Sequence, residues 1–462
     1  MRWNLGTFLA GIVLTAATAR GATELSQYGI TWKFDRDYPA GRFCNGDLWV
    51  VGPVKLIAIE NSWHTHGPKP EPGLDGSMIN PPATDKQGYD KRLNSYVAAL
   101  NVAERSPTGK SPLELKAGES LVSAVSWLVG EPGCPKINGG TGMPRPVLRD
   151  AAVLTCLAAA PPEGSFRPPY CGRDKAVRFN KKDLKYALLK ALPPVNGTPD
   201  LAGIEKSVAR PWIDHVYQFL GAMVHPSENM PQYGREFSIT LGDAALLLLL
   251  DLPKEQKEKI LVGFVQIGID FAAIADNGGG WPSNGGHHMG RKWPILFAGI
   301  MLNDAHMKGV GQWKTAFQED LDTFYVSQAE VDMTHGSAWS PDSRASRKAY
   351  EKKDVGLPEW GIVHTTKPAA DNMAWDATYR GINNVGYTGW VLAAQIMGQK
   401  PAWNHDPLFD YADRLAACDP KAFSSEFVKN MWKSYRAGCG PAWVPDDASD
   451  PYSPGKRQIK VR

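Results

Sequence analysis

The stretch FRPPYCGRDK, residues 166–175, separates two parts of the chain that differ in residue pattern. Before it, short runs of β-branched and aromatic residues alternate with glycine and proline, which is typical of strands joined by turns. After it, apolar residues recur at spacings of three and four over segments of helix length. The pattern therefore predicts a multidomain α+β chain that divides near this stretch.

The first part, residues 24–172, is predicted to be a β-sandwich-like domain. Its clearest strand patterns are GITWKFDRDYPAGRF (29–43) and DLWVVGPVKLIAIEN (47–61). The runs SLVSAVSWLV (120–129) and PVLRDAAVLTCLAAAPP (146–162) continue the pattern. Several short strands bounded by turn residues favour two packed sheets.

The second part, residues 180–462, is predicted to be an α/α toroid, an incomplete barrel of helical hairpins. Several segments carry apolar residues over most of their circumference, as inner or sandwiched helices do. The predicted helical segments are DLKYALLKAL (183–192), PWIDHVYQFLGAMV (211–224), LGDAALLLLLDL (241–252), KEKILVGFVQIGIDFAAIA (257–275), WPILFAGIMLND (293–304), WKTAFQEDLDTFYVSQ (313–328), GYTGWVLAAQIMG (386–398) and FDYADRLAAC (409–418). In such a ring the loops at one end build the pocket.

Residues 1–21 are predicted to be a cleaved secretory signal. Arg2 precedes an apolar segment, Leu5 to Ala17, and small residues follow, so that cleavage after Ala19 or Gly21 fits. The apolar segment is too short for a bilayer core of about 30 Å, and no later segment reaches the length of a membrane span. We therefore expect a secreted or periplasmic protein without a membrane partner.

The composition is that of an ordinary globular chain. Of the 462 residues, 43% are hydrophobic and 21% charged, and the formal net charge of +3 is too small to indicate a nucleic-acid partner. Sixteen tryptophans, fifteen tyrosines and fifteen phenylalanines provide flat surfaces on which sugar rings stack, and they also fill large cores. These features do not determine the oligomeric state.

The six cysteines contain no CxxC pair, which disfavours a zinc or iron–sulfur site. An even count in an oxidising compartment permits disulfides. We expect a Cys418–Cys439 bond and pairs among the four earlier cysteines, with buried thiols as the alternative. No cofactor is predicted, and a structural divalent cation is compatible with the sequence.

Polar and aromatic side chains gather in four loops of the helical part, each beside an apolar helix. The candidate residues are Asn229, Tyr233 and Arg235 in the first loop, Trp281, Asn284, His287, His288, Arg291 and Lys292 in the second, His335 and Trp339 in the third, and Tyr379, Arg380 and Asn383 in the fourth. The adjacent histidines lack the spacing of a zinc motif, and no strand precedes NGGHHMG as a dinucleotide site requires.

These side chains suit one chemical task in particular. Arginine, histidine and asparagine together bind and neutralise a carboxylate. A neutralised uronate has a more acidic proton on the adjacent carbon, and a tyrosine or histidine can remove it and protonate the departing glycosidic oxygen. The loops thus predict eliminative cleavage of an anionic polysaccharide. The alternative for single residues is structural, such as helix capping by the histidines or an ion pair between Arg235 and Glu236.

Three stretches also resemble a known group of enzymes. YGREFS (233–238), NGGHHMGRKWPILFAGIMLND (284–304) and YRGINNVGYTGWVLAAQIMG (379–398) resemble the α/α-toroid polysaccharide lyases that act on alginate and glucuronan. The doubled histidine and the missing NNHxYW-type string depart from some members. The resemblance implies that Asn229, His287 or His288, and Arg291 neutralise the carboxylate, with Tyr233 or Tyr379 as base and acid; of these, Asn229 is counted as substrate-binding and the others as catalytic. The other residues of the four loops are expected to bind substrate.

Two other classes of function remain open from the sequence. A glycoside hydrolase on the same scaffold needs two carboxyl groups facing the scissile bond. Its candidates are Glu236, Asp276, Asp332, Asp371 and Asp376. A non-catalytic glycan-binding protein would use the aromatic loops as its binding face.

Overall fold

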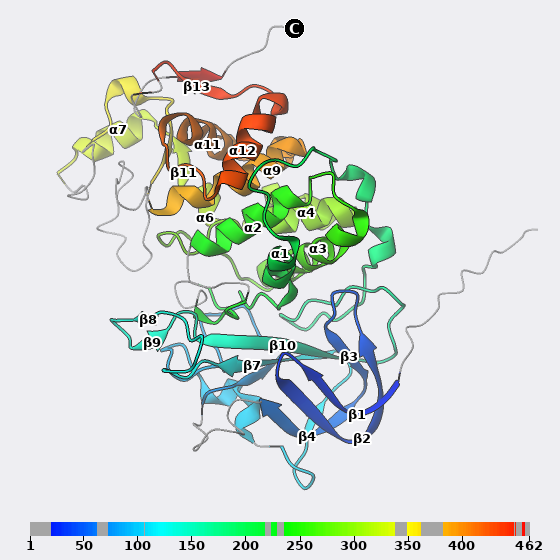
Figure 1. The fold of residues 1–462 in the computed structure, drawn as a ribbon. Coiled ribbons are helices and arrows are strands. Elements are labelled where there is room, and N and C mark those ends of the chain that lie inside the picture. Colours follow the sequence, from blue (N-terminus) through cyan, green and yellow to red (C-terminus); the bar gives the residue numbers. More distant parts are fainter. Residues whose placement is uncertain are drawn as a thin grey trace, which may run out of the picture.

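The computed structural model describes residues 20–61, 73–105, 107–217, 223–228, 235–337, 349–361, 382–447, 449 and 455–457. The N-terminal part is rich in sheet and the C-terminal part is helical, so the chain is of mixed α and β class (Figure 1). No helix within these ranges is long and apolar enough to cross a membrane.

The predicted signal lies almost wholly outside the described residues. Strand β1 begins at Arg20 and pairs along β2 from Ala40 to Ile30. A cut after Ala19 would leave β1 whole, whereas a cut after Gly21 would remove its first two residues.

One continuous sheet forms the N-terminal part. Its strands are β1 (Arg20–Gln27), β2 (Ile30–Arg42), β3 (Leu48–Val51), β4 (Val54–Asn61), β5 (Ser77–Ile79), β6 (Leu113–Leu115), β7 (Glu119–Ser126) and β10 (Leu148–Leu157). They follow the order β5-β7-β10-β3-β2-β4-β6, with β1 beside β2, and only β3 and β10 run parallel. Strand β2 pairs with β4 at Ile30–Phe34 and with β3 at Ala40–Arg42. This long strand therefore joins the two halves of the sheet. A short hairpin of β8 (Ile137–Asn138) and β9 (Met143–Pro144) lies outside this order.

The sheet folds over its own apolar core. Trp32 of β2 is fully buried and packs in one cluster with Leu121 of β7 and Leu154 of β10, although these strands are not its neighbours in the sheet order. The Trp32 Nε1 donates to Ser123 Oγ at 3.0 Å. The hydrogen bond and the shared cluster bring β2 close to β7, which lies three places away in the sheet order.

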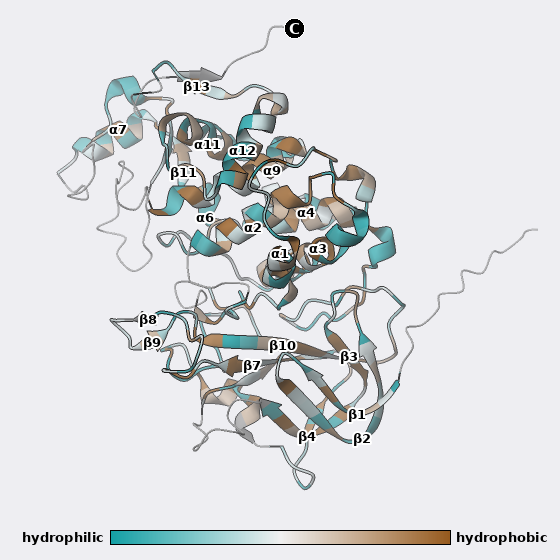
Figure 2. Ribbon diagram, viewed as in Figure 1, coloured by the Kyte–Doolittle hydropathy of each residue, from teal (hydrophilic) through white to brown (hydrophobic). Residues whose placement is uncertain are grey.

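Strands β7 and β10 have two buried faces. Leu121 and Val125 point into the sheet core, whereas Val122 and Ala124 belong to the large core that also contains the helices. Alternating side chains of a strand point to opposite faces, so both faces must be apolar here. The hydrophobic colour accordingly runs along much of β10 and over the central helices (Figure 2).

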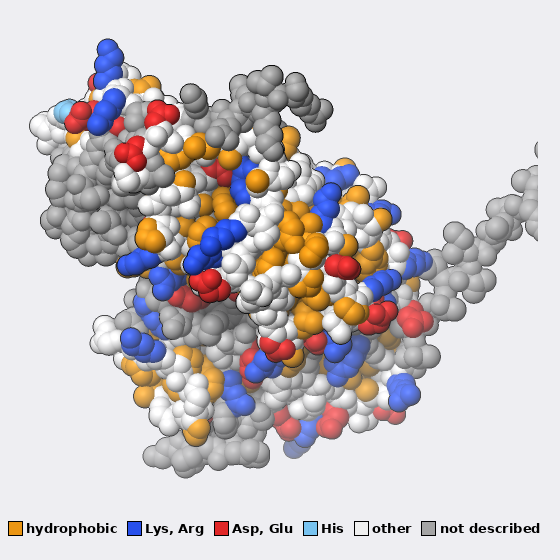
Figure 3. Space-filling view, turned by 45° about the horizontal axis from the view of Figure 1, so that its top comes forward, with side chains coloured by type: hydrophobic (Ala, Val, Ile, Leu, Met, Phe, Trp, Pro, Cys, Tyr) orange, Lys and Arg blue, Asp and Glu red, His pale blue; other side chains and the backbone are white. Residues whose placement is uncertain are grey.

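The helical part surrounds α4, in which every side chain is buried. Its helices are α1 (Leu201–Ala209), α2 (Arg235–Leu247), α3 (Lys254–Asp276), α4 (Lys292–Leu302), α5 (Ala305–Lys308), α6 (Gln318–Leu321), α7 (Gln328–His335), α9 (Thr388–Ile396), α10 (Lys400–Trp403), α11 (Asp406–Cys418) and α12 (Glu426–Tyr435). Helices α2 and α9 cross where Gly242 meets Gly389, because a Cβ on Gly242 would lie 3.1 Å from the Gly389 Cα. Figure 3 shows hydrophobic side chains over the middle of one helical face, with charges of both signs around them.

Three of the predicted helical segments are wrong where the structure describes them. Residues 183–192 form only the 3-10 turns η3 (Lys181–Asp183) and η4 (Tyr186–Leu188), and residues 211–217 have no helix. Residues 313–328 break into α6 and the strand β11 (Thr323–Tyr325), which pairs with β12 (Pro358–Trp360). Tertiary hydrogen bonds replace the helical ones: Lys185 N donates to Met301 O, and Thr84 N donates to His215 O. Helices α1 and α12, which the sequence did not single out, form instead.

The structure contains no disulfide among the six cysteines, all of which lie in described residues. The expected Cys418–Cys439 bond is therefore wrong for this structure. Cys156 and Cys171 are buried, and burial raises the pKa of each thiol to about 12. Both thiols therefore remain protonated and unreactive.

A buried arginine of the dividing stretch ties the two parts together. Arg167 Nε donates to Asp47 Oδ2 at 2.5 Å, just before β3, and its Nη2 donates to Asp270 Oδ2 of α3 at 2.5 Å. Gln266 of α3 also donates to the Arg167 carbonyl at 3.1 Å. Removing one member of a buried pair leaves the other charge uncompensated, which is far more costly than never burying either.

We therefore expect Arg167→Met to lower the free energy of unfolding by about 3–5 kcal/mol. Arg178→Met is the matched control, because its partner Asp174 and Arg178 itself are both more than half exposed, and its loss should stay below about 1 kcal/mol. Urea unfolding followed by tryptophan fluorescence measures both. Equal losses in the two variants would contradict a central role for Arg167.

Candidate functional site

The carboxylate of Asp214 is the centre of a buried network in the helical part. Its Oδ2 accepts from Arg291 Nε at 2.9 Å and from Trp281 Nε1 at 2.6 Å, and its Oδ1 lies 3.0 Å from His225 Nε2. All four side chains are buried. Burial alone would raise the pKa of Asp214, but Arg291 and His225 outweigh burial and hold this pKa well below its usual range.

This network determines what Arg291 and Trp281 can do. The Arg291 guanidinium also donates to Met289 O at 2.9 Å and lies 3.4 Å from the centre of the Phe237 ring. Neither Arg291 nor Trp281 has exposed surface. Arg291, predicted to neutralise a uronate carboxylate, pairs here with the carboxylate of Asp214. Trp281, predicted to bind substrate, fills the core beside Phe317.

Side chains of the segment that contains α6 accept hydrogen bonds from the backbone of the loop before α4. Gln318 Oε1 accepts from His288 N at 2.8 Å, and His288 Nδ1 lies 2.7 Å from Pro282 O. Glu319 accepts from Gly290 N at 3.1 Å and from Lys292 N at 2.9 Å. A carboxylate at these N–H groups caps α4 and interacts favourably with its dipole.

Lys292, predicted to bind substrate, also makes its contacts within the protein. Its ammonium pairs with Asp320 and donates to Trp403 O at 2.8 Å, and the residue is 2% exposed. His288 is similarly buried, at 1% exposed. The buried side chains of Lys292 and His288 therefore hold the loop in position on the protein core.

Some amide groups of the same region do lack hydrogen-bond partners. Asn284 Nδ2, Asn383 Nδ2 and Asn384 Nδ2 are buried and unpaired, and so is Ser283 Oγ. Gly286 lies against Asn383, since a Cβ on Gly286 would be 2.1 Å from Asn383 Oδ1. A buried amide donor without a partner is costly unless a ligand or water completes it.

Three of the four predicted loops meet at this place. Arg235, at the start of α2, donates from Nη1 to Ile382 O and from Nε to Glu236 Oε1 at 3.2 Å. The first loop therefore ends beside the fourth, and the contact of Gly286 with Asn383 adds the second loop. The helices that carry these ends, α2 and α9, cross directly.

The described part of the third loop lies apart from the place where the other three loops meet. His335 ends α7 on the surface, and its Nδ1 lies 2.9 Å from Val331 O. Figure 1 shows α7 at the upper left, at one edge of the helical part. The predicted residues Asn229, Tyr233, Trp339, Tyr379 and Arg380 lie outside the described residues.

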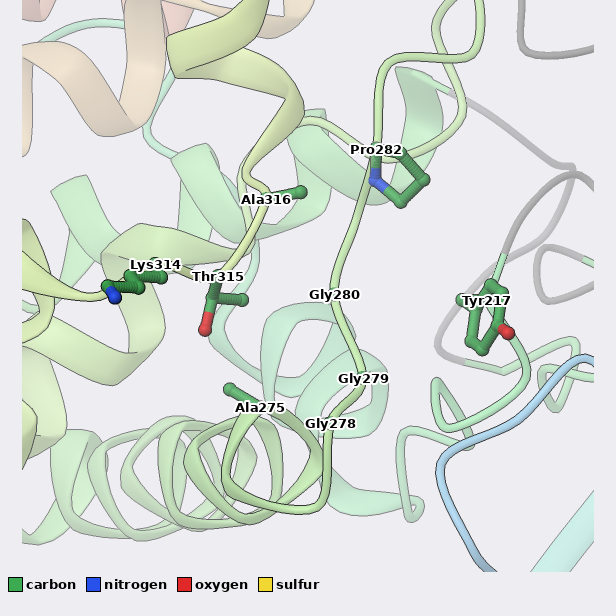
Figure 4. Close-up of a pocket in the computed structure, with 9 residues that line it drawn as sticks. All are labelled: Tyr217, Ala275, Gly278, Gly279, Gly280, Pro282, Lys314, Thr315 and Ala316. Carbon is green, nitrogen blue, oxygen red and sulfur yellow. The ribbon is translucent and has the colours of Figure 1, made fainter.

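A cavity of about 400 Å³ adjoins the second loop (Figure 4). Its glycine backbone, residues 278–280, runs between Tyr217 on one side and Lys314 and Thr315 on the other. Trp281 N donates to Ala316 O at 2.7 Å, which fixes the glycine backbone to the side of the cavity formed by Lys314 and Thr315. Glycines without side chains let a ligand ring approach the backbone closely.

Three of the five carboxylates of the hydrolase alternative have another partner within the protein. Glu236 pairs with Arg235, Asp276 lies 2.8 Å from His306 Nε2, and Asp332 accepts from Gln328 at 2.8 Å on α7. Asp371 and Asp376 lie outside the described ranges. Within those ranges, no group of three His, Cys, Asp or Glu side chains has the geometry to hold a metal ion.

No family model, curated protein or solved structure matches the chain. Any proposal of function therefore rests on the geometry and chemistry of the site alone.

Several important residues were not predicted from the sequence. Asp214 lay inside a segment interpreted as helix, and Gln318 and Glu319 lay inside another. The carboxylate of Asp214 within an apolar run was the available signal, because a buried charge must be paired. Ser283 and Asn384 adjoin predicted residues and share their loops.

We expect Arg291→Met to lower the free energy of unfolding by about 3–5 kcal/mol, because Asp214 would stay buried with one partner fewer. Adding Asp214→Asn should restore part of this loss, because it removes the unpaired charge. Thermal unfolding of the single and double variants tests the coupling. If Arg291→Met were as stable as the wild type, the structural role of the guanidinium would be contradicted and ligand binding would remain its expected role.

The carboxyl of Glu319 should make stability depend on pH. Burial, and after it Asp320, raises the pKa of Glu319 to about 7. The folded protein then holds this proton to a higher pH than the unfolded chain does, so the contribution of Glu319 to the free energy of unfolding falls as pH rises from about 4 to 7, by up to about 3 kcal/mol.

Glu319→Gln removes this titration. Urea unfolding at pH 5 and pH 8 should show the variant gaining stability relative to the wild type at the higher pH. A difference between the two proteins that does not change with pH would contradict the raised pKa.

Proposed function

We propose that the protein is a secreted polysaccharide lyase that cleaves a uronate-containing chain by β-elimination. Its scaffold would be an α/α toroid of helical hairpins beside a β-sandwich-like domain. The observation that supports this function best is the meeting of three polar loops around buried amide donors that lack partners. No cofactor is required for this chemistry.

The unpaired amides suit the uronate carboxylate. Asn284 and Asn383 are 5% and 3% exposed, so a hydrogen bond from either to a carboxylate oxygen would form in a poorly solvated place. Donors aimed at a carboxylate stabilise the enolate-like intermediate, whose extra charge develops on the same oxygens. In this arrangement His288, Arg291 and Lys292 position the loop and do not touch substrate.

Proton transfer is assigned to Tyr233 or Tyr379, the two tyrosines that the resemblance implies as base and acid. Tyr233 stands two positions before Arg235 in the sequence, and Tyr379 three before Ile382. The base takes the proton from the carbon beside the carboxylate, the bond to the glycosidic oxygen breaks, and a carbon–carbon double bond forms. An acid returns a proton to the departing oxygen.

The glycine-floored cavity suits a neighbouring sugar of the same chain. Tyr217 provides an aromatic face, and the exposed Lys314 provides a positive charge at the opposite wall. Pro282 lines this cavity, and its carbonyl contacts His288, so the cavity and the amide donors share one loop. An anionic polymer could therefore occupy both places at once.

The activity test uses alginate, glucuronan and related uronate polysaccharides. A lyase generates an unsaturated uronate that absorbs in the ultraviolet, a hydrolase releases reducing ends without that absorbance, and a binding protein retains the polymer intact. Intact polymers throughout the panel would overturn the proposal.

Asn284→Ala and Asn383→Ala should each lower kcat/KM by about 10- to 100-fold, the value of a hydrogen bond to a charged group. Asn430→Ala is the matched control, because this exposed amide bonds to Asn196 O far from the loops in sequence. Steady-state kinetics on the best polymer measures all three. Unchanged kinetics in both loop variants would exclude the amides from the site.

Tyr233→Phe and Tyr379→Phe separate the two candidate bases. The variant that lacks the base should lose more than about 100-fold in kcat while binding polymer normally, since general base catalysis is worth about 10²–10⁴. Full activity in both variants would exclude tyrosine as the base.

A further inference from the structure

A second cavity, of about 320 Å³, lies where the dividing stretch meets the end of α3 and the short helix α5. It shares no lining residue with the glycine-floored cavity. Its size falls within the range of small-molecule sites.

One side of this cavity is apolar. Phe179 and Pro169 come from the dividing stretch and its continuation, Ile269 from α3 and Met307 from α5. Ile269 and Met307 are buried, whereas Phe179 is half-buried and so presents part of its ring. This side would accept a ring or a short hydrocarbon body.

The rim is acidic. Asp174, Asp276 and Asp304 line it, with Arg178 as the one guanidinium among the lining residues. Arg178 Nη2 is already paired with Asp174 Oδ2 at 2.5 Å. Three carboxylates against one guanidinium, with His306 beside Asp276, leave the rim with an excess of negative charge.

Two neighbouring features hold the rim in place. Asp304 Oδ1 accepts from Met307 N at 2.8 Å and so caps α5. His306 Nε2 lies 2.8 Å from Asp276 Oδ1, and the His306 ring stacks on Trp313 with centroids 4.6 Å apart. Both carboxylates are thus fixed in position and still partly solvent-accessible.

The end of α3 adds to the negative potential. This helix has 23 residues and ends at Asp276, with Asn277 as its C-cap, and both residues line the cavity. The C-terminus of a long helix carries the equivalent of about half a negative charge. The helix dipole and the two carboxylates therefore favour a cation.

We propose that this cavity binds a small organic cation, an ammonium group on a ring or short apolar body. The ammonium group would lie at Asp276 and Asp304, and the apolar body would lie against Phe179 and Met307. The negative charge of the rim excludes a uronate, which is also negative, from this cavity. The cation site is independent of the proposed lyase activity.

The test titrates the full chain with three probes of similar shape: phenethylamine, 2-phenylethanol and 3-phenylpropionate. Calorimetry or saturation-transfer NMR gives their relative affinities. The amine should bind at least about 5-fold more tightly than the alcohol, and the acid most weakly, because one charge interaction near a protein surface is worth about 1 kcal/mol. Equal binding of amine and alcohol would overturn the proposal.

Two variants locate the binding. Asp276→Asn should weaken the amine about 5-fold and leave the alcohol unchanged. Phe179→Ala should weaken both probes. Asp332→Asn, an exposed carboxylate on α7, is the control and should change neither. Asn383→Ala should also bind the amine normally, which distinguishes this site from the lyase site. Amine binding that survives both Asp276→Asn and Phe179→Ala would refute the assignment.

Discussion

The pairing of Arg167 with Asp47 and Asp270 is the constraint on which the rest of the architecture depends. The three side chains are buried where the sheet meets α3, and each charge there is tolerated only because its partners are present. Asp47 fixes the approach to β3, and Asp270 fixes the middle of α3. The large apolar core continues across the same junction, since the outer faces of β7 and β10 pack with the helices. The sheet-rich and helical parts therefore share one apolar core beside this ion cluster, while the sheet also encloses a core of its own.

A second buried cluster, around Asp214, organises the loops. It uses Arg291 and Trp281 to anchor the glycine-rich loop on the core, while Gln318 and Glu319 hold the same loop from the other side. These strong groups are satisfied internally, whereas the amides of Asn284 and Asn383 are among the buried donors without a partner. Buried charges position the glycine-rich loop, and in the proposed function the neutral donors of this loop and of the Asn383 loop would recognise substrate.

The two cavities near the end of α3 differ in electrostatic character. The glycine-floored cavity has Lys314 at its wall and backbone at its floor, whereas the other is bordered by Asp276 and Asp304 at a helix C-terminus. Opposite charges beside the end of α3 would keep an anionic polymer and a cationic small molecule in separate places, because each would be repelled from the other's site.

The sequence by itself determined the division into a sheet-rich and a helical part, the strands from Ile30 to Asn61, and the apolar helices α3, α4, α9 and α11, because these follow from local periodicity. It also located the loops in which the candidate donors lie. Only the tertiary structure decided that residues 211–217 are not helical and that Arg291 and Lys292 face inward. The physical reason is that partners such as Asp214 and Asp320 are distant in sequence, and the direction of a charged side chain depends on where its partner is buried. The same holds for Asn383, whose position beside Gly286 depends on how two distant loops pack.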